Sequence, residues 1–171
     1  YTIAPLPTLT VALVLTEGLD CTVTPDAIIT GTITGGSGPF THAVSINGGA
    51  YSSLGVVSSP FTYTTPTEGT YQFQIIDANG CIAESAVQTI NAISFPDILS
   101  VIQTEPILCN GDSNAAIDIT IDSSVGTPVF ILNVNNDTTG TNYGTQTSGL
   151  PAGSYTITLT DGNSCTDTEL I

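Results

Sequence analysis

A stretch from the middle of the chain recurs near its end. Residues 69–81 read GTYQFQIIDANGC and residues 153–165 read GSYTITLTDGNSC, which places the two copies 84 positions apart. Upstream, Thr16-Glu17 with Cys21 matches Thr104-Glu105 with Cys109 at an offset of 88, so the second copy is four residues shorter in its middle. Two landmarks in the same order indicate a tandem repeat, and a period of this length is typical of a string of equivalent domains.

Proline residues indicate where each copy begins. Pro5 and Pro7 precede the first apolar segment and Pro96 precedes the second, as expected for residues that punctuate structural elements. We therefore predict a first domain over 8–95 and a second over 96–171, with residues 1–7 as the tail of a preceding repeat or a linker. The short link at 93–95, next to a proline, favours a semi-rigid connection.

Apolar and polar residues alternate with a period of two in both copies. In antiparallel sheets this pattern places one face on a core and the other in water. The predicted inward residues of the first copy are Val11, Leu13 and Leu15, then Ile29 and Ile33, then Phe40, His42, Val44 and Ile46, then Tyr71, Phe73 and Ile75. Those of the second copy are Leu99 and Val101, then Ile117, Ile119 and Ile121, then Phe130, Leu132 and Val134, then Tyr155, Ile157 and Leu159.

Turn-forming segments separate these runs. The segments Gly35–Pro39, Asn47–Gly49 and Asp161-Gly162 are rich in residues that tolerate tight turns. About seven short strands in each copy predict an all-β fold of two tandem immunoglobulin-like β-sandwich domains with Greek-key topology. The Gly-x-Tyr sequences at Tyr71 and Tyr155 predict tyrosine corners, in which the hydroxyl bonds an upstream backbone group.

The charge balance excludes several partners. The chain has 15 acidic residues, no Lys or Arg, and a formal net charge of −15. A surface without cations has nothing to neutralise phosphates, so we expect no binding to nucleic acid or to anionic membrane headgroups. No stretch reaches the roughly 18 apolar residues of a membrane-spanning helix, so direct membrane insertion is not expected either.

Four cysteines are available as covalent staples, which small domains often need because burial alone leaves their stability thin. Of the three possible pairings, Cys21 with Cys81 and Cys109 with Cys165 gives both copies the same internal bridge. Closing a loop of nearly 60 residues stabilises a domain by about 4 kcal/mol in the chain-entropy model. Two such bridges predict an oxidising, extracellular compartment.

Several motifs resemble one known family. The second copy carries CNGDSN at 109–114, IDI at 117–119 and LPAGSY at 150–155, while the first carries GSGPF at 36–40 but lacks the Asn-Gly-Asp after Cys21. In these residues the chain resembles the SprB repeat family, repeats of very large cell-surface adhesins of gliding Bacteroidetes. The resemblance covers nearly the whole chain as two copies, and its motifs are mostly turn and core residues, which specify the fold more firmly than the function.

The resemblance implies a structural role. The repeats would form the stalk of a secreted adhesin filament, exported by the type IX route, held on the outer membrane and placing a distal tip against a surface or glycan ligand. The implied partners are neighbouring repeats of the same long chain and the anchoring or secretion machinery. Gliding motility is implied by the family alone. The start at Tyr1, without Met or a basic signal region, leads us to expect that the chain is part of a longer protein.

Catalysis is not expected. His42 is the only histidine and falls at an apolar position of the alternation, which favours a packed side chain over an acid–base group. Nucleophilic triads would lack their base in the second copy. The acidic residues lie in turns, which argues against a paired-carboxylate site for glycoside hydrolysis. We therefore predict that the protein is not an enzyme and needs no cofactor.

Calcium binding and glycosylation are the chemical alternatives. Oxygen ligands at alternate positions are found in three turns: Asp77 with Asn79, Asp112 with Asn114, and Asp161 with Asn163. Such residues are also common in turns that bind nothing, and the spacing lacks the distal Glu of an EF-hand loop. Thr138, in Asp137-Thr138-Thr139, is a candidate for O-glycosylation, with a plain polar loop as the alternative.

Two other functions remain open alongside the stalk. The apolar segment from Leu6 to Leu15 could be donated as a strand to a neighbouring molecule in a polymerised extracellular filament. A carbohydrate-binding module is the second alternative, for which Tyr51, Tyr63 and Tyr143 are the candidate surface aromatics. Pairing of residues 9–15 inside their own domain would favour the stalk over strand donation.

Overall fold

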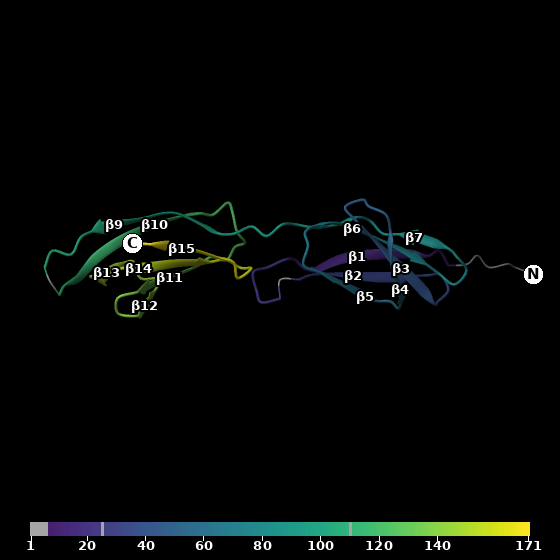
Figure 1. The fold of residues 1–171 in the computed structure, drawn as a ribbon, viewed down its shortest axis with the longest axis horizontal. Helices are drawn as coiled ribbons and strands as arrows, with labels where there is room; N and C mark the ends of the chain where they lie inside the picture. The colour runs from purple at the N-terminus through teal and green to yellow at the C-terminus, as the bar shows by residue number, and fades with distance from the viewer. Residues whose placement is uncertain (1–6, 25, 110) are drawn as a thin grey trace, which may run out of the picture. The chain divides into compact units, whose positions relative to one another are not determined.

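The computed structural model describes residues 7–24, 26–109 and 111–171, which form strands and connecting turns (Figure 1). The described residues divide into two compact units. Unit 1 comprises those within Tyr1–Asp20 and Thr24–Ala92, and unit 2 comprises Cys21–Val23 and those within Ile93–Ile171. The main division lies between residues 92 and 93, at the start of the predicted link, and residues 21–23 of the predicted first domain belong to unit 2. The predicted tail at 1–7 lies outside the described residues apart from Pro7.

Unit 1 is built from two antiparallel sheets. Its strands are β1 (Thr10–Glu17), β2 (Ala27–Thr34), β3 (Phe40–Ile46), β4 (Ser52–Val57), β5 (Phe61–Thr65), β6 (Gly69–Ile76), β7 (Ile82–Glu84) and β8 (Gln88–Ile90). One sheet has the order β1-β2-β5. The other has the order β4-β3-β6-β7, and β8 also pairs with β6, so β7 and β8 act as two parts of one interrupted edge strand.

Unit 2 repeats this plan. Its strands are β9 (Asp97–Glu105), β10 (Ser113–Asp122), β11 (Ile131–Asn136), β12 (Thr141–Gly144), β13 (Ser148–Pro151), β14 (Tyr155–Thr160) and β15 (Thr166–Leu170). The sheets have the orders β13-β10-β9 and β12-β11-β14-β15. Strand for strand this is the order of unit 1, which confirms the prediction of an all-β, immunoglobulin-like fold in two copies.

Each unit has its own hydrophobic core between its two sheets. In unit 1 the fully buried side chains include Ile29, Tyr71, Phe73 and Ile75, and in unit 2 they include Val134, Leu150, Ile157 and Leu159. The alternation in β6 and β14 therefore predicted the inward face correctly. In the part of the chain that the structure describes, no helix is long and apolar enough to span a membrane.

The predicted face was wrong at the start of β9. Leu99 was expected inward, but it is 58% exposed, and Ile98 is buried in its place at 4%. The pairing of β9 with β10 is irregular here, since Ser100 lies opposite Thr120 whereas Ile98 lies opposite Ile121. A bulge of this kind shifts the alternation by one residue. Ile46 was also expected inward, but it lies at the last position of β3 and is 41% exposed.

Candidate functional site

A tyrosine corner is present in both units. The Tyr71 hydroxyl donates to the Thr67 carbonyl at 2.7 Å, and the Tyr155 hydroxyl donates to the Pro151 carbonyl at 2.6 Å. Both rings are buried. Gly69 suits the position two residues before Tyr71, because its φ of +142° is one that other residues rarely adopt, and a Cβ there would also lie 2.5 Å from Asn47 Oδ1. These contacts fix the loop that precedes β6 and β14 to the strand that follows it.

A buried carboxylate holds the turn after each of these strands. In unit 1, Asp77 Oδ1 accepts from the backbone N–H groups of Asn79 at 2.9 Å and Cys81 at 2.8 Å, and Oδ2 accepts from the N–H of Ser37 at 3.0 Å. Burial would raise the pKa of Asp77, but the hydrogen bonds from Cys81, Ser37 and Asn79 outweigh it and hold this pKa below its usual value.

The turn of unit 2 has the same construction. Asp161 Oδ1 accepts from the N–H groups of Asn163 and Cys165, both at 2.9 Å, and Oδ2 accepts from the N–H of Thr127 at 2.8 Å. Thus each carboxylate ties its own turn to a second loop and orients the cysteine that follows. The repeated Asp-x-Asn sequence singled out these turns, but it did not reveal that the carboxylates point at backbone amides.

The cysteine pairing differs from the prediction. A disulfide joins Cys21 to Cys165, with their Cα atoms 4.8 Å apart, and the N–H of Cys21 donates to the carbonyl of Asn163 at 2.9 Å. The predicted pairs Cys21–Cys81 and Cys109–Cys165 are absent, and Cys81 and Cys109 are exposed free thiols. The prediction was wrong because it assumed that both members of a bridge belong to the same repeat.

The location of Cys21 explains the observed bond. Cys21 follows β1 in the chain, yet residues 21–23 have their contacts in unit 2 and belong to that unit. Cys165 is completely buried in unit 2, whereas its counterpart Cys81 in unit 1 is exposed. The bond closes a loop with a sequence separation of 144 residues, for which the chain-entropy model gives a stabilisation of about 5 kcal/mol.

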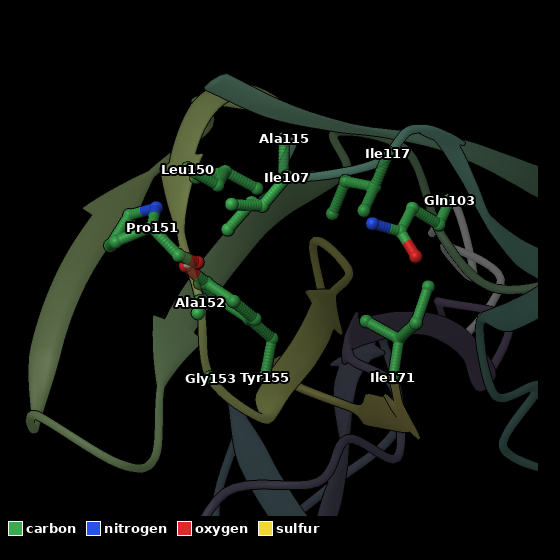
Figure 2. A pocket seen from close by; sticks show the side chains of 10 residues that line it. All are labelled: Gln103, Ile107, Ala115, Ile117, Leu150, Pro151, Ala152, Gly153, Tyr155 and Ile171. Carbon is green, nitrogen blue, oxygen red and sulfur yellow. Dashed lines mark hydrogen bonds between the residues drawn. The ribbon is translucent and has the colours of Figure 1, made fainter. Parts of the chain in front are cut away.

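Unit 2 also contains an apolar groove with a volume of about 290 Å³ (Figure 2). Figure 2 shows Gln103, Ile117 and Ile171 at one end of it and Leu150 and Pro151 at the other. Its walls come from β9, β10, β13 and β14, so it lies between the two sheets of the unit.

In unit 1 the corresponding place is filled. Ile90 of β8 lies opposite Gly69 and is only 2% exposed, so it forms part of the core. In unit 2 the backbone of Tyr155 bonds Ile171 in both directions, at 2.8 and 3.0 Å. Ile171 therefore corresponds to Gln88 of unit 1, and the position that corresponds to Ile90 lies two residues beyond Ile171.

The calcium candidates do not come together in one site. No group of three or more His, Cys, Asp or Glu side chains that could hold a metal is found within residues 7–24, 26–109 and 111–171. Asp77 and Asp161 each already accept three backbone N–H hydrogen bonds. Asp112 and Asn114 are exposed at the start of β10. Calcium binding through Asp77, Asn79, Asp112, Asn114, Asp161 and Asn163 stays a prediction.

His42 is packed between strands. It is half-buried in β3, its Nδ1 lies 3.1 Å from the Gly55 carbonyl, and its ring centroid lies 5.4 Å from that of Phe61. These contacts give the side chain a place in the sandwich.

The remaining surface candidates are dispersed. Tyr63 packs edge-on against Phe73, with ring centroids 5.3 Å apart, and Tyr143 packs against Tyr155 at 6.1 Å. Tyr51 is also half-buried, so these rings do not form an exposed aromatic platform. Thr138 is exposed in the turn between β11 and β12, where its Oγ1 accepts from the N–H of Ser154 at 3.3 Å.

No family model matches the chain, and no curated protein matches it. Among solved structures, the fibronectin(III)-like modules of CbhA from Clostridium thermocellum align at 12% identity with a TM-score of 0.40, over 92% of this chain and 90% of that one. A tetra-tandem repeat in the extending region of a large adhesion protein aligns at 15% identity with a TM-score of 0.32, over 96% of this chain. This chain spans 49% of that protein. Because these alignments are weak, the fold assignment rests on the strand order and core packing described above.

Proposed function

We propose that this chain is a pair of structural repeats from the stalk of an extracellular adhesin, which transmits tension between an anchor and a distal contact. The chain repeats one sandwich plan, with the same strand order, the same tyrosine corner and the same carboxylate-held turn in both copies. A repeated scaffold of this kind supplies length and stiffness.

The observation that carries the proposal is the bond between Cys21 and Cys165. Under tension applied at the chain ends, the residues between two bonded cysteines cannot be drawn out. The sequence separation of 144 residues corresponds to roughly 500 Å of extended chain at about 3.5 Å per residue. A single covalent bond therefore protects most of this 171-residue chain from mechanical extension.

Composition supports an extracellular setting. Disulfides persist in oxidising compartments and are rare in the cytosol. Solubility at a net charge of −15 without Lys or Arg comes from mutual repulsion and many hydroxyl groups.

The resemblance to SprB repeats supports the finer proposals, namely attachment to the outer membrane after type IX export, contact with a surface or glycan ligand at a distal tip, and a part in gliding motility. Within this proposal the chain has no enzymatic activity.

The pairing of β1 favours the stalk over strand donation. Thr10–Leu15 pair in register with residues 29–34 of β2 in the same unit, so this part of the segment considered for donation is already used. Leu6 lies outside the described residues. A carbohydrate-binding platform is less well supported, because Tyr63 and Tyr143 pack against buried aromatic rings.

Single-molecule force spectroscopy tests the proposal. The chain is held at its two termini and stretched without reductant, and only the segments outside Cys21 and Cys165 are expected to extend. With reductant, or in the variant Cys165→Ser without reductant, two further unfolding steps are expected that together release roughly 500 Å. Cys81→Ser is the matched control, because it removes an exposed thiol and should behave as the unchanged chain. Full extension of the unchanged chain without reductant would refute the role in carrying tension.

A further inference from the structure

The two free cysteines are the repeat counterparts of the two bonded ones. Cys21 and Cys109 are equivalent at an offset of 88, and each lies between the first two strands of its copy; we call them loop cysteines. Cys81 and Cys165 are equivalent at an offset of 84, and each follows the Asp-x-Asn turn; we call them turn cysteines. The disulfide joins a loop cysteine to a turn cysteine, and one cysteine of each kind is left free.

The turn at Cys81 already has the geometry of the bonded turn. The N–H of Cys81 donates to Asp77 Oδ1 at 2.8 Å, as that of Cys165 donates to Asp161 Oδ1 at 2.9 Å. The carbonyls of the two cysteines accept from the N–H groups of the same aspartates at 3.0 and 2.9 Å. The turn thus takes the same form with and without a bonded partner, which means that Cys81 is presented ready for one.

The two turns differ in how far they are covered by other residues. In unit 2 the loop-cysteine backbone of Cys21 donates to the Asn163 carbonyl, and Cys165 is completely buried. In unit 1 the equivalent residues Asn79 and Cys81 are both exposed. Cys81 is therefore accessible to a segment like the one that carries Cys21. Cys109 is the loop cysteine of the second copy, and it is free and exposed.

We propose that Cys109 of one molecule forms a disulfide with Cys81 of a second copy of this chain, which repeats the Cys21–Cys165 linkage between molecules. The two thiols lose two electrons and two protons, and a low-molecular-weight disulfide such as oxidised glutathione accepts them and becomes two thiols. Since each copy carries one cysteine of each kind, the contact is head-to-tail and can join more than two molecules. The inference does not require the stalk function, because it concerns bonds between molecules.

The first measurement counts free thiols in the folded monomer. Alkylation without reductant, followed by peptide mass mapping, should modify Cys81 and Cys109 and leave Cys21 and Cys165 unmodified until the chain is unfolded and reduced. Modification of all four cysteines, or of none, would overturn the proposal at its premise.

The decisive experiment mixes two variants. Cys81→Ser offers only Cys109, and Cys109→Ser offers only Cys81; both substitutions are at exposed positions, and circular dichroism checks that the fold is kept. In a glutathione redox buffer the mixed dimer should exceed the two homodimers together by about tenfold or more, because docking raises the effective concentration of the correct pair. The unchanged chain should give a ladder of oligomers, whose linking peptides contain Cys109 and Cys81.

Random oxidation of exposed thiols predicts a different result. Mixed and like-with-like dimers would then form in statistical proportion, or glutathione adducts would dominate, and either outcome would refute the proposal. The variant with both Cys81→Ser and Cys109→Ser must stay monomeric in the same buffer. Because these assays leave the Cys21–Cys165 bond in place, their failure would not affect the stretching experiment, and the two proposals can fail separately.

Discussion

At the scale of single residues, the turn carboxylates have the clearest structural role. Asp161 is 4% exposed and accepts three backbone hydrogen bonds, from Thr127, Asn163 and Cys165. A carboxylate suits this position because both of its oxygens only accept. In the substitution Asp161→Asn one oxygen becomes an amide nitrogen that must face a backbone N–H.

We expect Asp161→Asn to destabilise unit 2 by about 1–3 kcal/mol, the cost of leaving a buried donor unpaired. Chemical denaturation monitored by circular dichroism measures the change. Asp112→Asn is the matched control, since Asp112 is exposed and the same loss of charge there should have little effect. Equal effects of the two substitutions would show that charge, and not the turn, is responsible.

The equivalent Asp77 predicts a dependence on pH. Burial would raise its pKa, but the hydrogen bonds outweigh burial and hold the pKa below its usual value. A carboxylate whose pKa is lower in the folded state stabilises the fold at a pH above its unfolded value, and this contribution is lost as the pH falls through the folded value. The stability difference between the unchanged chain and Asp77→Asn should therefore be full at neutral pH and should shrink below about pH 4. Denaturation curves across this range measure it, and a constant difference would contradict the assignment.

At the scale of strands, the interrupted edge strand beside β6 contains one residue that stabilises the core of unit 1 and one that does not. Ile90 of β8 is 2% exposed and belongs to the core, whereas Ile82 of β7 is 60% exposed. Both pair with β6 and both are isoleucine. They therefore form an internal comparison of a buried and an exposed residue of one type.

Ile90→Ala should destabilise unit 1 by about 2–5 kcal/mol, because it leaves a cavity in a packed core. Ile82→Ala should change the stability by less than about 0.5 kcal/mol, as is usual at the surface. Denaturant unfolding of both variants supplies the comparison. If the two substitutions cost the same, β8 does not close the core of unit 1 as described.

Much at this scale could be predicted from the sequence, and the exceptions have physical causes. The alternation around Phe73 and Ile157 gave the correct inward face, because both lie in regular central strands where the period of two is preserved. The face at Leu99 could not be predicted, because the bulge in β9 shifts the alternation by one residue and leaves no pattern in the sequence.

The cysteine partners could not be predicted for a different reason. A repeat requires equivalent cysteines to have equivalent surroundings, and a bond within each copy satisfies that requirement. A bond from the loop cysteine of one copy to the turn cysteine of the next satisfies it equally well, and this is the kind of bond formed by Cys21 and Cys165. The sequence contains no signal that distinguishes these two patterns, since the segment around Cys21 carries no landmark for the unit in which it lies.

At the scale of the whole molecule, the charge distribution is the dominant feature. With 15 acidic residues and no Lys or Arg, nearly every interaction between charged side chains is repulsive. Such self-repulsion destabilises a compact state relative to the expanded chain. Dissolved ions screen it, and the Debye length falls from about 30 Å at 0.01 M to about 3 Å at 1 M ionic strength.

We therefore expect the melting temperature to rise as NaCl increases from about 0.01 M to about 1 M, the range over which this screening develops. A gain on the order of 1 kcal/mol in one unit corresponds to roughly 4–8 °C, the value for a domain of about 60–100 residues. A protein stabilised by surface salt bridges would show the opposite change in melting temperature, since screening weakens attraction as well.

Melting temperatures measured in CaCl₂ and in NaCl at the same ionic strength separate general screening from calcium binding at a site. If calcium raises the melting temperature no more than NaCl does, the Asp77, Asp112 and Asp161 turns hold no calcium. If calcium raises it more, and Asp112→Asn removes the extra rise, a calcium ion binds at the start of β10.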